Sequence, residues 1–261
     1  MVHAMYKFLR PWRPSYGRVS FVAPGLVLKT GPSIRLAEAL TIDFLAKNTS
    51  VPVPRIFTAF EDPDTRNRYI LMSRVKGIPL HEAWHHMPQK VRDDVLAQLR
   101  AYMSEVRALK PPNPGQVGSF DYTPLWDDRI FAGAFGPFAS PEEFHFAVRA
   151  GRTEENIKPG GFHSSEKGLE EVGELIQQYS SRQYSIHLTH GDLYLRNIMV
   201  HNGKISGIVD WEMAGWFPDY WEYTNTRYSF WQTPHLRPCI DDFLERRSSD
   251  LRMEQLRRKH F

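Results

Sequence analysis

The sequence has a single cysteine, Cys239, among its 261 residues. One thiol cannot form an internal disulfide or a multi-thiolate metal site, which excludes the disulfide-rich and zinc-finger classes and indicates a reducing compartment. No apolar run approaches the roughly 18 residues that cross a bilayer, and the N-terminal residues lack the apolar core of a signal peptide. We therefore expect a cytoplasmic protein that makes no contact with a membrane.

Net charge is also scarce, because 33 lysine and arginine residues face 30 aspartate and glutamate residues. A formal charge of +3 is too small to indicate a nucleic-acid partner, and none is expected. Basic residues gather near the C-terminus, but interleaved acidic residues favour a solvated helix over a nucleic-acid tail. The chain is 41% hydrophobic and 13% aromatic, and it is long enough for two lobes. This composition and length predict a well-packed fold.

The first 76 residues predict a small, strand-rich lobe. Apolar residues alternate on both sides of Pro24-Gly25, which indicates a β-hairpin, and apolar residues recur at helical spacing after Pro32. The expected elements are a hairpin over residues 18–30, a helix over 34–48 and strands over 55–60 and 69–72. Strand signals stop near Gly77, so we place a boundary there between an N-lobe of residues 1–76 and a C-lobe of residues 77–261.

The rest of the chain predicts a larger, mainly helical lobe. Apolar residues on one face indicate a long amphipathic helix over residues 89–110, and a second helix is expected from Glu166 to about Tyr179. Between them, residues 111–165 are rich in proline, glycine and aromatic residues and show no steady period. Long connections of this kind are typical of binding loops or lids.

The most informative segment runs from Ile186 to Phe217. A short strand leads into the loop His-Gly-Asp-Leu-Tyr-Leu-Arg-Asn, residues 190–197, and the apolar strand 198–200 leaves that loop at once. Asn202-Gly203 is typical of a tight hairpin turn, because both residues tolerate positive φ angles. The returning strand ends at Asp210. Since the hairpin folds back on itself, the residues before its first strand and after its second strand are expected to lie at the same end.

Three polar residues, Asp192, Asn197 and Asp210, can therefore converge. Carboxylate and amide oxygens are the ligands that Mg²⁺ takes, so we predict Asn197 and Asp210 as metal ligands. Asp192, set back on the loop, is then free to accept the proton of an attacking hydroxyl and hold that hydroxyl in line. A metallohydrolase that uses His190 with the two aspartates is an alternative, but it needs more ligands than this neighbourhood offers.

His190-Gly191-Asp192, followed by Asn197, a hairpin and Asp210-Trp211, resembles the catalytic and metal-binding segments of the aminoglycoside phosphotransferase and choline kinase superfamily. The run from Ile208 to Tyr223 is similar to the fungal branch of this superfamily, and the resemblance extends upstream to residues 50–54 and 69–72. It implies an α+β, bilobal protein-kinase-like fold. It also implies ATP- and Mg²⁺-dependent phosphorylation of a hydroxyl on a small molecule, such as an aminoglycoside, choline or another natural product.

The resemblance implies a role for each matching residue of the loop and hairpin. Asp192 would be the catalytic base, and Asn197 and Asp210 would be the Mg²⁺ ligands. His190 would brace the loop. Asp219 would hydrogen-bond the backbone of the loop, with capping of the following helix as its alternative role.

Upstream, Lys29 and Glu38 resemble the phosphate-binding lysine of the family and its partner on the next helix. An ammonium that is fixed by a carboxylate can hold the phosphates of a nucleotide. A solvent-facing lysine and glutamate are the alternative. The resemblance further implies that Met72, Ser73 and Val75 lie in the hinge whose backbone groups pair with adenine.

One feature departs from the family. The hairpin before Lys29 should hold a glycine-rich phosphate loop, but only Gly17 and Gly25 are present, and the residues before Val19 leave room for at most one earlier strand. This departure raises the alternative of a catalytically impaired, nucleotide-binding pseudokinase or scaffold with the same fold.

In relatives the acceptor lies among the long insert, here residues 111–165, and the helices after the metal motif. Acidic side chains there would suit an amine-bearing alcohol, whereas aromatic side chains would suit an apolar natural product or simply pack in the core. The acidic candidates are Asp127, Asp128, Glu142, Glu143, Glu154, Glu155 and Glu222, and the aromatic candidates are Trp126, Phe131, Phe135, Phe138 and Phe144.

Overall fold

The computed structural model describes residues 15–127, 130, 133–153, 165–230 and 234–261. The chain divides into two compact units, and each uses two separate stretches of sequence. Unit 1 consists of Met1–Val106 and Leu193–Glu212, and unit 2 consists of Arg107–Asp192 and Met213–Phe261. Unit 1 thus extends beyond Gly77, and a lobe boundary at that residue stays a prediction. Within the described ranges, no helix has both the length and the apolar character needed to cross a membrane.

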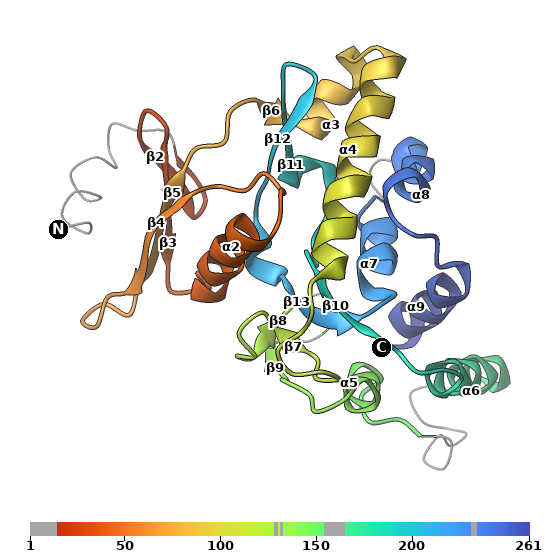
Figure 1. Cartoon of the computed structure of the whole chain (residues 1–261). Helices are drawn as coiled ribbons and strands as arrows, with labels where there is room; N and C mark the ends of the chain where they lie inside the picture. The colour runs from red at the N-terminus through yellow and green to blue at the C-terminus, as the bar shows by residue number, and fades with distance from the viewer. Residues whose placement is uncertain (1–14, 128–129, 131–132, 154–164, 231–233) are drawn as a thin grey trace. The chain divides into compact units, whose positions relative to one another are not determined.

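A five-stranded antiparallel sheet, in the order β1-β2-β3-β5-β4, forms one half of unit 1 (Figure 1). Helix α2 packs on β4 and β5, where Ile34, Ala39, Ile70 and Met72 form a buried apolar cluster. The strands are β1 (Ser15–Tyr16), β2 (Val19–Ala23), β3 (Leu26–Gly31), β4 (Ile56–Glu61) and β5 (Arg68–Ser73), and the helix is α2 (Leu36–Asn48). The hairpin, helix and two strands predicted for this region are all confirmed.

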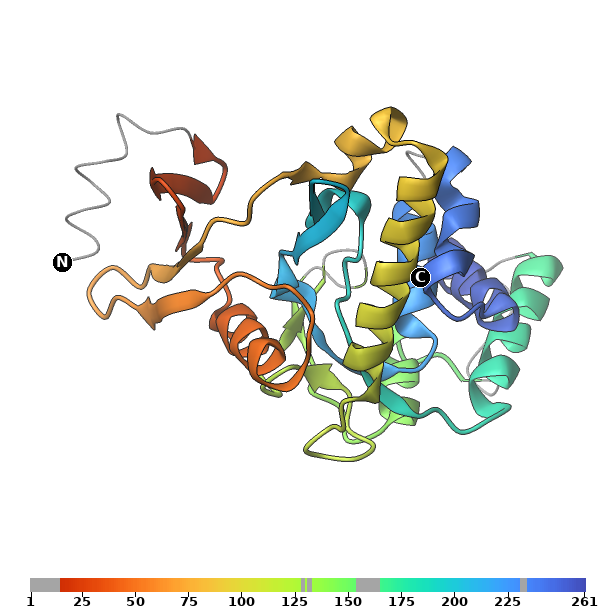
Figure 2. The same cartoon turned by 45° about the horizontal axis from the view of Figure 1, so that its top comes forward.

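The other half of unit 1 joins the middle of the chain to its C-terminal part. A three-stranded sheet has the order β12-β11-β6, and its turn places Asn202 at φ 50° and Gly203 at φ 73°, as a tight hairpin turn requires. The β11–β12 hairpin runs beside α4, where the Ile205 N–H donates to Gln98 Oε1 at 3.2 Å (Figure 2). The elements are β6 (Ile78–Pro79), α3 (Leu80–Ala83), α4 (Gln89–Ala108), β11 (Ile198–His201) and β12 (Lys204–Ile208).

Unit 2 combines a small antiparallel sheet, in the order β10-β13-β7, with five helices among the described residues. Phe144 lies at its core, with ring centroids 5.8 Å from Phe217 and 5.0 Å from Trp221. This aromatic candidate therefore packs the core. The strands are β7 (Gly118–Ser119), β8 (Leu125–Trp126), β9 (Ala134–Phe135), β10 (Ile186–Thr189) and β13 (Gly215–Pro218), and the helices are α5 (Pro141–Val148), α6 (Glu166–Ser180), α7 (Trp221–Ser229), α8 (Ile240–Phe243) and α9 (Ser248–His260).

The insert of residues 111–165 corrects one expectation, because it contains a regular helix, α5. Ser140 caps this helix by accepting the Glu143 N–H at 3.3 Å, and Glu143 Oε2 accepts the Ala139 N–H at 2.8 Å. Pro141 occupies the first turn, where its missing N–H costs nothing. Ser-x-x-Glu followed by apolar residues is a helix-start signal in the sequence that the absence of a long period obscured.

Candidate active site

Lys29 stands at the centre of a buried ionic cluster in unit 1. It lies on β3, between strands β2 and β5, and its Nζ donates to Glu38 Oε1 at 2.7 Å and to Asp210 Oδ1 at 2.6 Å. Glu38 comes from the first turn of α2, and Asp210 follows β12. Lys29 is only 9% exposed and Glu38 only 1%, which excludes the solvent-facing alternative for this pair.

The charges in this cluster do not balance. Burial alone would lower the pKa of Lys29, but the carboxylates of Glu38 and Asp210 outweigh that effect and raise it, so the lysine is a firm cation. Burial raises the pKa of Glu38 to about 7, although the ammonium of Lys29 opposes the shift. One lysine is thus shared by two carboxylates, and the cluster has an excess of negative charge.

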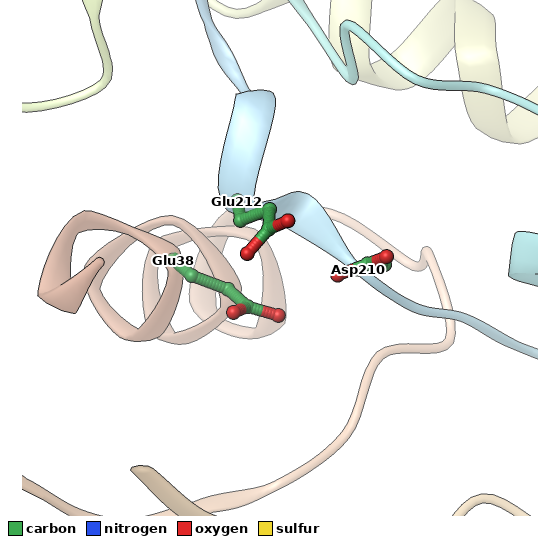
Figure 3. A group of neighbouring side chains, drawn as sticks. All are labelled: Glu38, Asp210 and Glu212. Atoms are coloured by element: carbon green, nitrogen blue, oxygen red, sulfur yellow. The ribbon is translucent and has the colours of Figure 1, made fainter. Parts of the chain in front are cut away.

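A divalent cation fits this surplus of oxygen ligands. The carboxylates of Glu38, Asp210 and Glu212 offer ligand atoms that lie within 4.8 Å of one another (Figure 3). Glu38 Oε2 and Glu212 Oε2 are buried and accept no hydrogen bond from the described residues. The Val209 N–H donates to the backbone oxygen of Asn197 at 2.9 Å, which brings the segments of Asn197 and Asp210 together at one end of the hairpin, as predicted.

Asp210 also has an unusual backbone conformation, with φ at 67°. Few residues that carry a Cβ adopt this left-handed region, although aspartate and asparagine do so more readily than others, and such residues cluster at functional sites. Asp210 lies two residues after the end of β12, where it accepts the bond from Lys29.

The cluster opens on a cavity of about 770 Å³ within unit 1. The Ser73 N–H is taken by the Arg55 carbonyl at 2.9 Å and the Arg74 N–H by the Gly25 carbonyl at 2.7 Å, whereas the Val75 N–H makes no hydrogen bond with the described residues. Val75 is therefore the predicted hinge residue with a donor to offer a ligand. The cavity is lined by the predicted residues Lys29, Glu38, Met72, Ser73, Val75, Asn197 and Asp210, together with Gly17, Arg18 and others.

The loop that carries Asp192 is held rigidly within unit 2. Gly191 has φ at 79°, and a Cβ at this position would lie 2.3 Å from the carbonyl oxygen of Met213, so only glycine fits between His190 and Asp192. His190 is fully buried, and its Nδ1 accepts the Asp192 N–H at 3.2 Å. This bond leaves Nδ1 unavailable to a metal, and the role of His190 in bracing the loop stays a prediction.

The acidic partner of this loop is Glu222, not Asp219, which corrects the sequence prediction. Glu222 lies in the first turn of α7, is 1% exposed and accepts the backbone N–H groups of His190 and, at 3.3 Å, Gly191. Burial raises the pKa of Glu222 against the effect of these two donors. Since its carboxylate is used here, Glu222 is also removed from the acidic acceptor candidates.

Asp219 instead belongs to an ionic network of unit 2. Its carboxylate accepts two hydrogen bonds from Arg182 and one from Arg247, all at 3.0 Å. The N-cap of α7 is Tyr220 and has no side-chain capping bond, so the capping alternative for Asp219 is wrong as well.

With this geometry described, comparison with known proteins settles the family. A model of the phosphotransferase enzyme family matches residues 26–257, which is most of the chain. The chain belongs to this family. The hygromycin-B 4-O-kinase of Escherichia coli is 23% identical over 211 residues, which are 78% of this chain and 55% of the relative. This family member thus spans about half the length of that curated relative.

Solved structures of aminoglycoside phosphotransferases share the fold of this family member. A thermostable mutant of aminoglycoside phosphotransferase APH(4)-Ia, in a ternary complex with ADP and hygromycin B, matches with a TM-score of 0.59 at 17% identity, covering 98% of this chain and 87% of that one. The GDP and kanamycin complex of APH(2")-IIia matches with a TM-score of 0.59 at 16% identity, covering 98% and 86%. The α+β, protein-kinase-like fold is confirmed, and the fungal branch stays a prediction.

The acceptor candidates of this phosphotransferase family member remain only partly placed. Asp127 is buried at 8% exposure, and Glu143 is used in the cap of α5. Phe135 packs against Phe138, with ring centroids 6.2 Å apart. Asp128, Phe131, Glu154, Glu155 and the side chain of Trp126 lie outside the described residues.

Proposed function

We propose that this chain is a phosphotransferase that moves the terminal phosphoryl group of ATP to a hydroxyl of a small molecule. The observation that carries the proposal is the buried Lys29 ammonium, bonded to both Glu38 and Asp210 at one end of a cavity that the hinge residues also line. Membership of the phosphotransferase family supports it, and so do the ADP and GDP complexes of proteins with the same fold.

The residues of unit 1 would handle the nucleotide. The Val75 N–H would pair with adenine beside Met72 and Ser73, and Lys29, positioned by Glu38, would hold the phosphates. Asn197 and Asp210 would hold Mg²⁺, whose charge would neutralise the phosphate oxygens. The excess of negative charge around Lys29 favours such a cation over a bare nucleotide anion.

Asp192 would orient the acceptor. The acceptor oxygen forms a bond to the γ-phosphorus while the bond from that phosphorus to the β,γ-bridging oxygen breaks, so ADP leaves and the hydroxyl proton passes to the Asp192 carboxylate. The rigid turn at Gly191, fixed by Glu222 and Met213, limits the freedom of this carboxylate. Little covalent work falls to the protein, and its contribution is position and charge.

Asp192→Asn tests this role, because the amide keeps the shape of the side chain but cannot take a proton. We expect phosphoryl transfer to fall by roughly a hundred- to ten-thousandfold while nucleotide affinity stays unchanged. Transfer would be followed by ADP release, coupled to a spectrophotometric reaction. Hygromycin B and kanamycin, which the related structures bind, are the first acceptors to screen. Turnover of the true acceptor by Asp192→Asn at the rate of the parent would disprove the role.

A pseudokinase of the same fold is the second candidate. The observation that favours it is the short turn between β1 and β2, which contains Gly17 as its sole glycine. A thermal-shift titration with Mg-ATP on the parent and on Asp210→Ala separates the possibilities. Stabilisation that is lost in Asp210→Ala supports a nucleotide site. Stabilisation of the parent without transfer to any acceptor would favour the pseudokinase, and absence of stabilisation would contradict both.

A further inference from the structure

The turn between β1 and β2 lines the cavity at the place where a glycine-rich phosphate loop would be expected. Tyr16 pairs with Val19, so Gly17 and Arg18 are the two central residues of the turn. Gly17 has φ at 58°, which suits the first central position of a tight hairpin turn. A Cβ on Gly17 would meet nothing within 4 Å, so this glycine serves the turn and does not make room for a close neighbour. Two residues offer few backbone N–H groups to a phosphate.

The side chain of Arg18 supplies what this backbone lacks. Its Nη2 donates to Glu212 Oε1 at 2.7 Å, and its Nη1 donates to Ser33 Oγ at 3.4 Å. The guanidinium is thereby held beside the carboxylate cluster, because Glu212 and Asp210 are separated by one residue and both lie within 4.8 Å of Glu38 at their ligand atoms. Arg18 and Lys29 both line the same cavity.

The two cations differ in how firmly they are held. Lys29 is buried and bonded to two carboxylates, whereas the Arg18 side chain is 45% exposed and pairs with one carboxylate that is 14% exposed. An ion pair with one exposed partner contributes less to stability than a buried one, so Arg18 loses little when it leaves Glu212 for a ligand. A guanidinium binds phosphate through two parallel hydrogen bonds, which makes phosphate the better partner.

We propose that Arg18 binds the phosphate groups of the nucleotide in place of a glycine-rich loop, and that Glu212 holds its guanidinium in the nucleotide-free protein. The ligand class is a nucleoside di- or triphosphate. This assignment rests on the proposed function, since it needs a nucleotide in the cavity of unit 1. It accounts for a turn with a single glycine at this place, because a side chain would perform the task that backbone N–H groups perform elsewhere.

Isothermal titration of the intact chain with Mg-ATP, Mg-ADP and adenosine tests the assignment. In Arg18→Gln we expect affinity for Mg-ATP to fall about tenfold and affinity for adenosine to stay unchanged, because only the phosphates lose a partner. An equal loss for adenosine would show a merely structural role and overturn the assignment, as would unchanged affinity for Mg-ATP. If the parent bound no nucleotide at all, the proposed function itself would fail.

Two further variants sharpen the result. Glu212→Gln should change the affinity for ADP without Mg²⁺ in the opposite direction, to a few-fold tighter binding, because Arg18 no longer has to leave an ion pair. Metal-free ADP is the probe here because the Glu212 carboxylate is also a candidate cation ligand. Arg74→Gln is the matched control: Arg74 lines the same cavity but stacks on Phe21 at 4.6 Å, near the hinge. Its loss should leave the ratio of Mg-ATP to adenosine affinity unchanged. Arg18→Lys should restore part of the affinity for Mg-ATP, and failure of this rescue together with a lowered ratio in Arg74→Gln would overturn the assignment.

Discussion

Two buried glutamates, one in each unit, respond to burial in opposite ways. Glu38 in unit 1 is 1% exposed and Glu254 in unit 2 is 2% exposed. Burial favours the neutral form of both side chains. At Glu254 the charges of Arg257 and Arg258 outweigh this effect and the pKa is lowered, whereas at Glu38 the pKa rises to about 7. The difference therefore comes from the partners and not from the depth of the side chain.

The number of cations for each carboxylate explains the contrast. Both oxygens of Glu254 accept hydrogen bonds from Arg257 at 2.8 Å, and Arg258 approaches one of them at 2.5 Å. Glu38 shares its single lysine with Asp210, and one of its oxygens accepts no hydrogen bond from the described residues. Glu254, whose charge is fully balanced by arginines, stabilises the fold. Glu38, whose charge is only partly balanced, is suited to a positively charged ligand.

The largest effect on the free energy of unfolding is expected when the ion pair between Glu254 and Arg257 is broken. Glu254→Gln leaves Arg257, which is 1% exposed, without its counter-charge, and we expect a loss of about 3–5 kcal/mol in the free energy of unfolding. Urea unfolding followed by tryptophan fluorescence measures this loss. In Glu254→Gln combined with Arg257→Met, most of the stability should return, because the fully buried charge of Arg257 is gone and Arg258 keeps its hydrogen bond to Asn225 Oδ1 at 2.8 Å. A loss of less than about 1 kcal/mol in the single variant would show that the pair does not hold unit 2 together.

Acid should destabilise unit 2 through a different buried group, His145. Burial, together with the charges of the nearby Arg149 and Arg182, lowers the pKa of His145 to about 3. The unfolded chain takes up a proton near the ordinary pKa of 6.5, while the folded protein cannot do so until about pH 3. The stability from neutral His145 is therefore complete above about pH 6.5 and is lost as the pH falls.

His145→Gln supplies the reference for this pH dependence, since glutamine does not titrate. Between about pH 7 and about pH 4, we expect the parent to lose about 3 kcal/mol more than the variant. The ring nitrogen Nε2 lies 3.0 Å from the Tyr220 hydroxyl, a contact that the glutamine amide can replace. The measurement is the free energy of unfolding of both proteins as a function of pH. An equal loss in the parent and in His145→Gln across this range would contradict the expectation. The ring is packed against Phe144, Tyr179, Tyr184 and Tyr220.

The smallest effect on stability is expected at Glu38, with the same substitution as at Glu254. In Glu38→Gln, Lys29 keeps Asp210 as its counter-charge and the amide oxygen still accepts a bond, so the free energy of unfolding should change by less than about 1 kcal/mol. Stabilisation by Mg-ATP should nevertheless fall several-fold, because a neutral amide holds the Lys29 ammonium less firmly than the Glu38 carboxylate does. Thermal shift with and without nucleotide measures both quantities, and a loss of stability as large as in Glu254→Gln would remove the contrast.

Local patterns in the sequence predicted much of the fold and part of the site. The apolar alternation and the Asn202-Gly203 turn identified both hairpins, and the helical spacing after Pro32 placed Glu38 on the helix that faces Lys29. The choice between Asp219 and Glu222 was beyond such patterns. Both acids stand near the start of α7, and only the packing of that helix determines which one reaches the loop.

Contacts between distant residues were likewise invisible in the sequence. Arg18 and Glu212 are separated by 194 positions, and no local pattern around either residue indicates the other as its partner. Their pairing depends on the return of residues 193–212 to the N-terminal part of the chain. The missed helix α5 is a different case, because its capping signal at Ser140 and Glu143 was present in the sequence.

The connectivity of the chain also determines which fragments and chimeras of this protein can retain its sites. A gene fragment that ends at Val106 encodes Lys29 and Glu38 but neither Asn197 nor Asp210, so it cannot carry the complete ionic cluster. A chimera that exchanges unit 2 for that of a relative needs crossover points on both sides of residues 193–212. One of those points falls at the peptide bond between Asp192 and Leu193, so recombination there can replace the residue proposed to orient the acceptor while the residues proposed to hold the nucleotide stay unchanged.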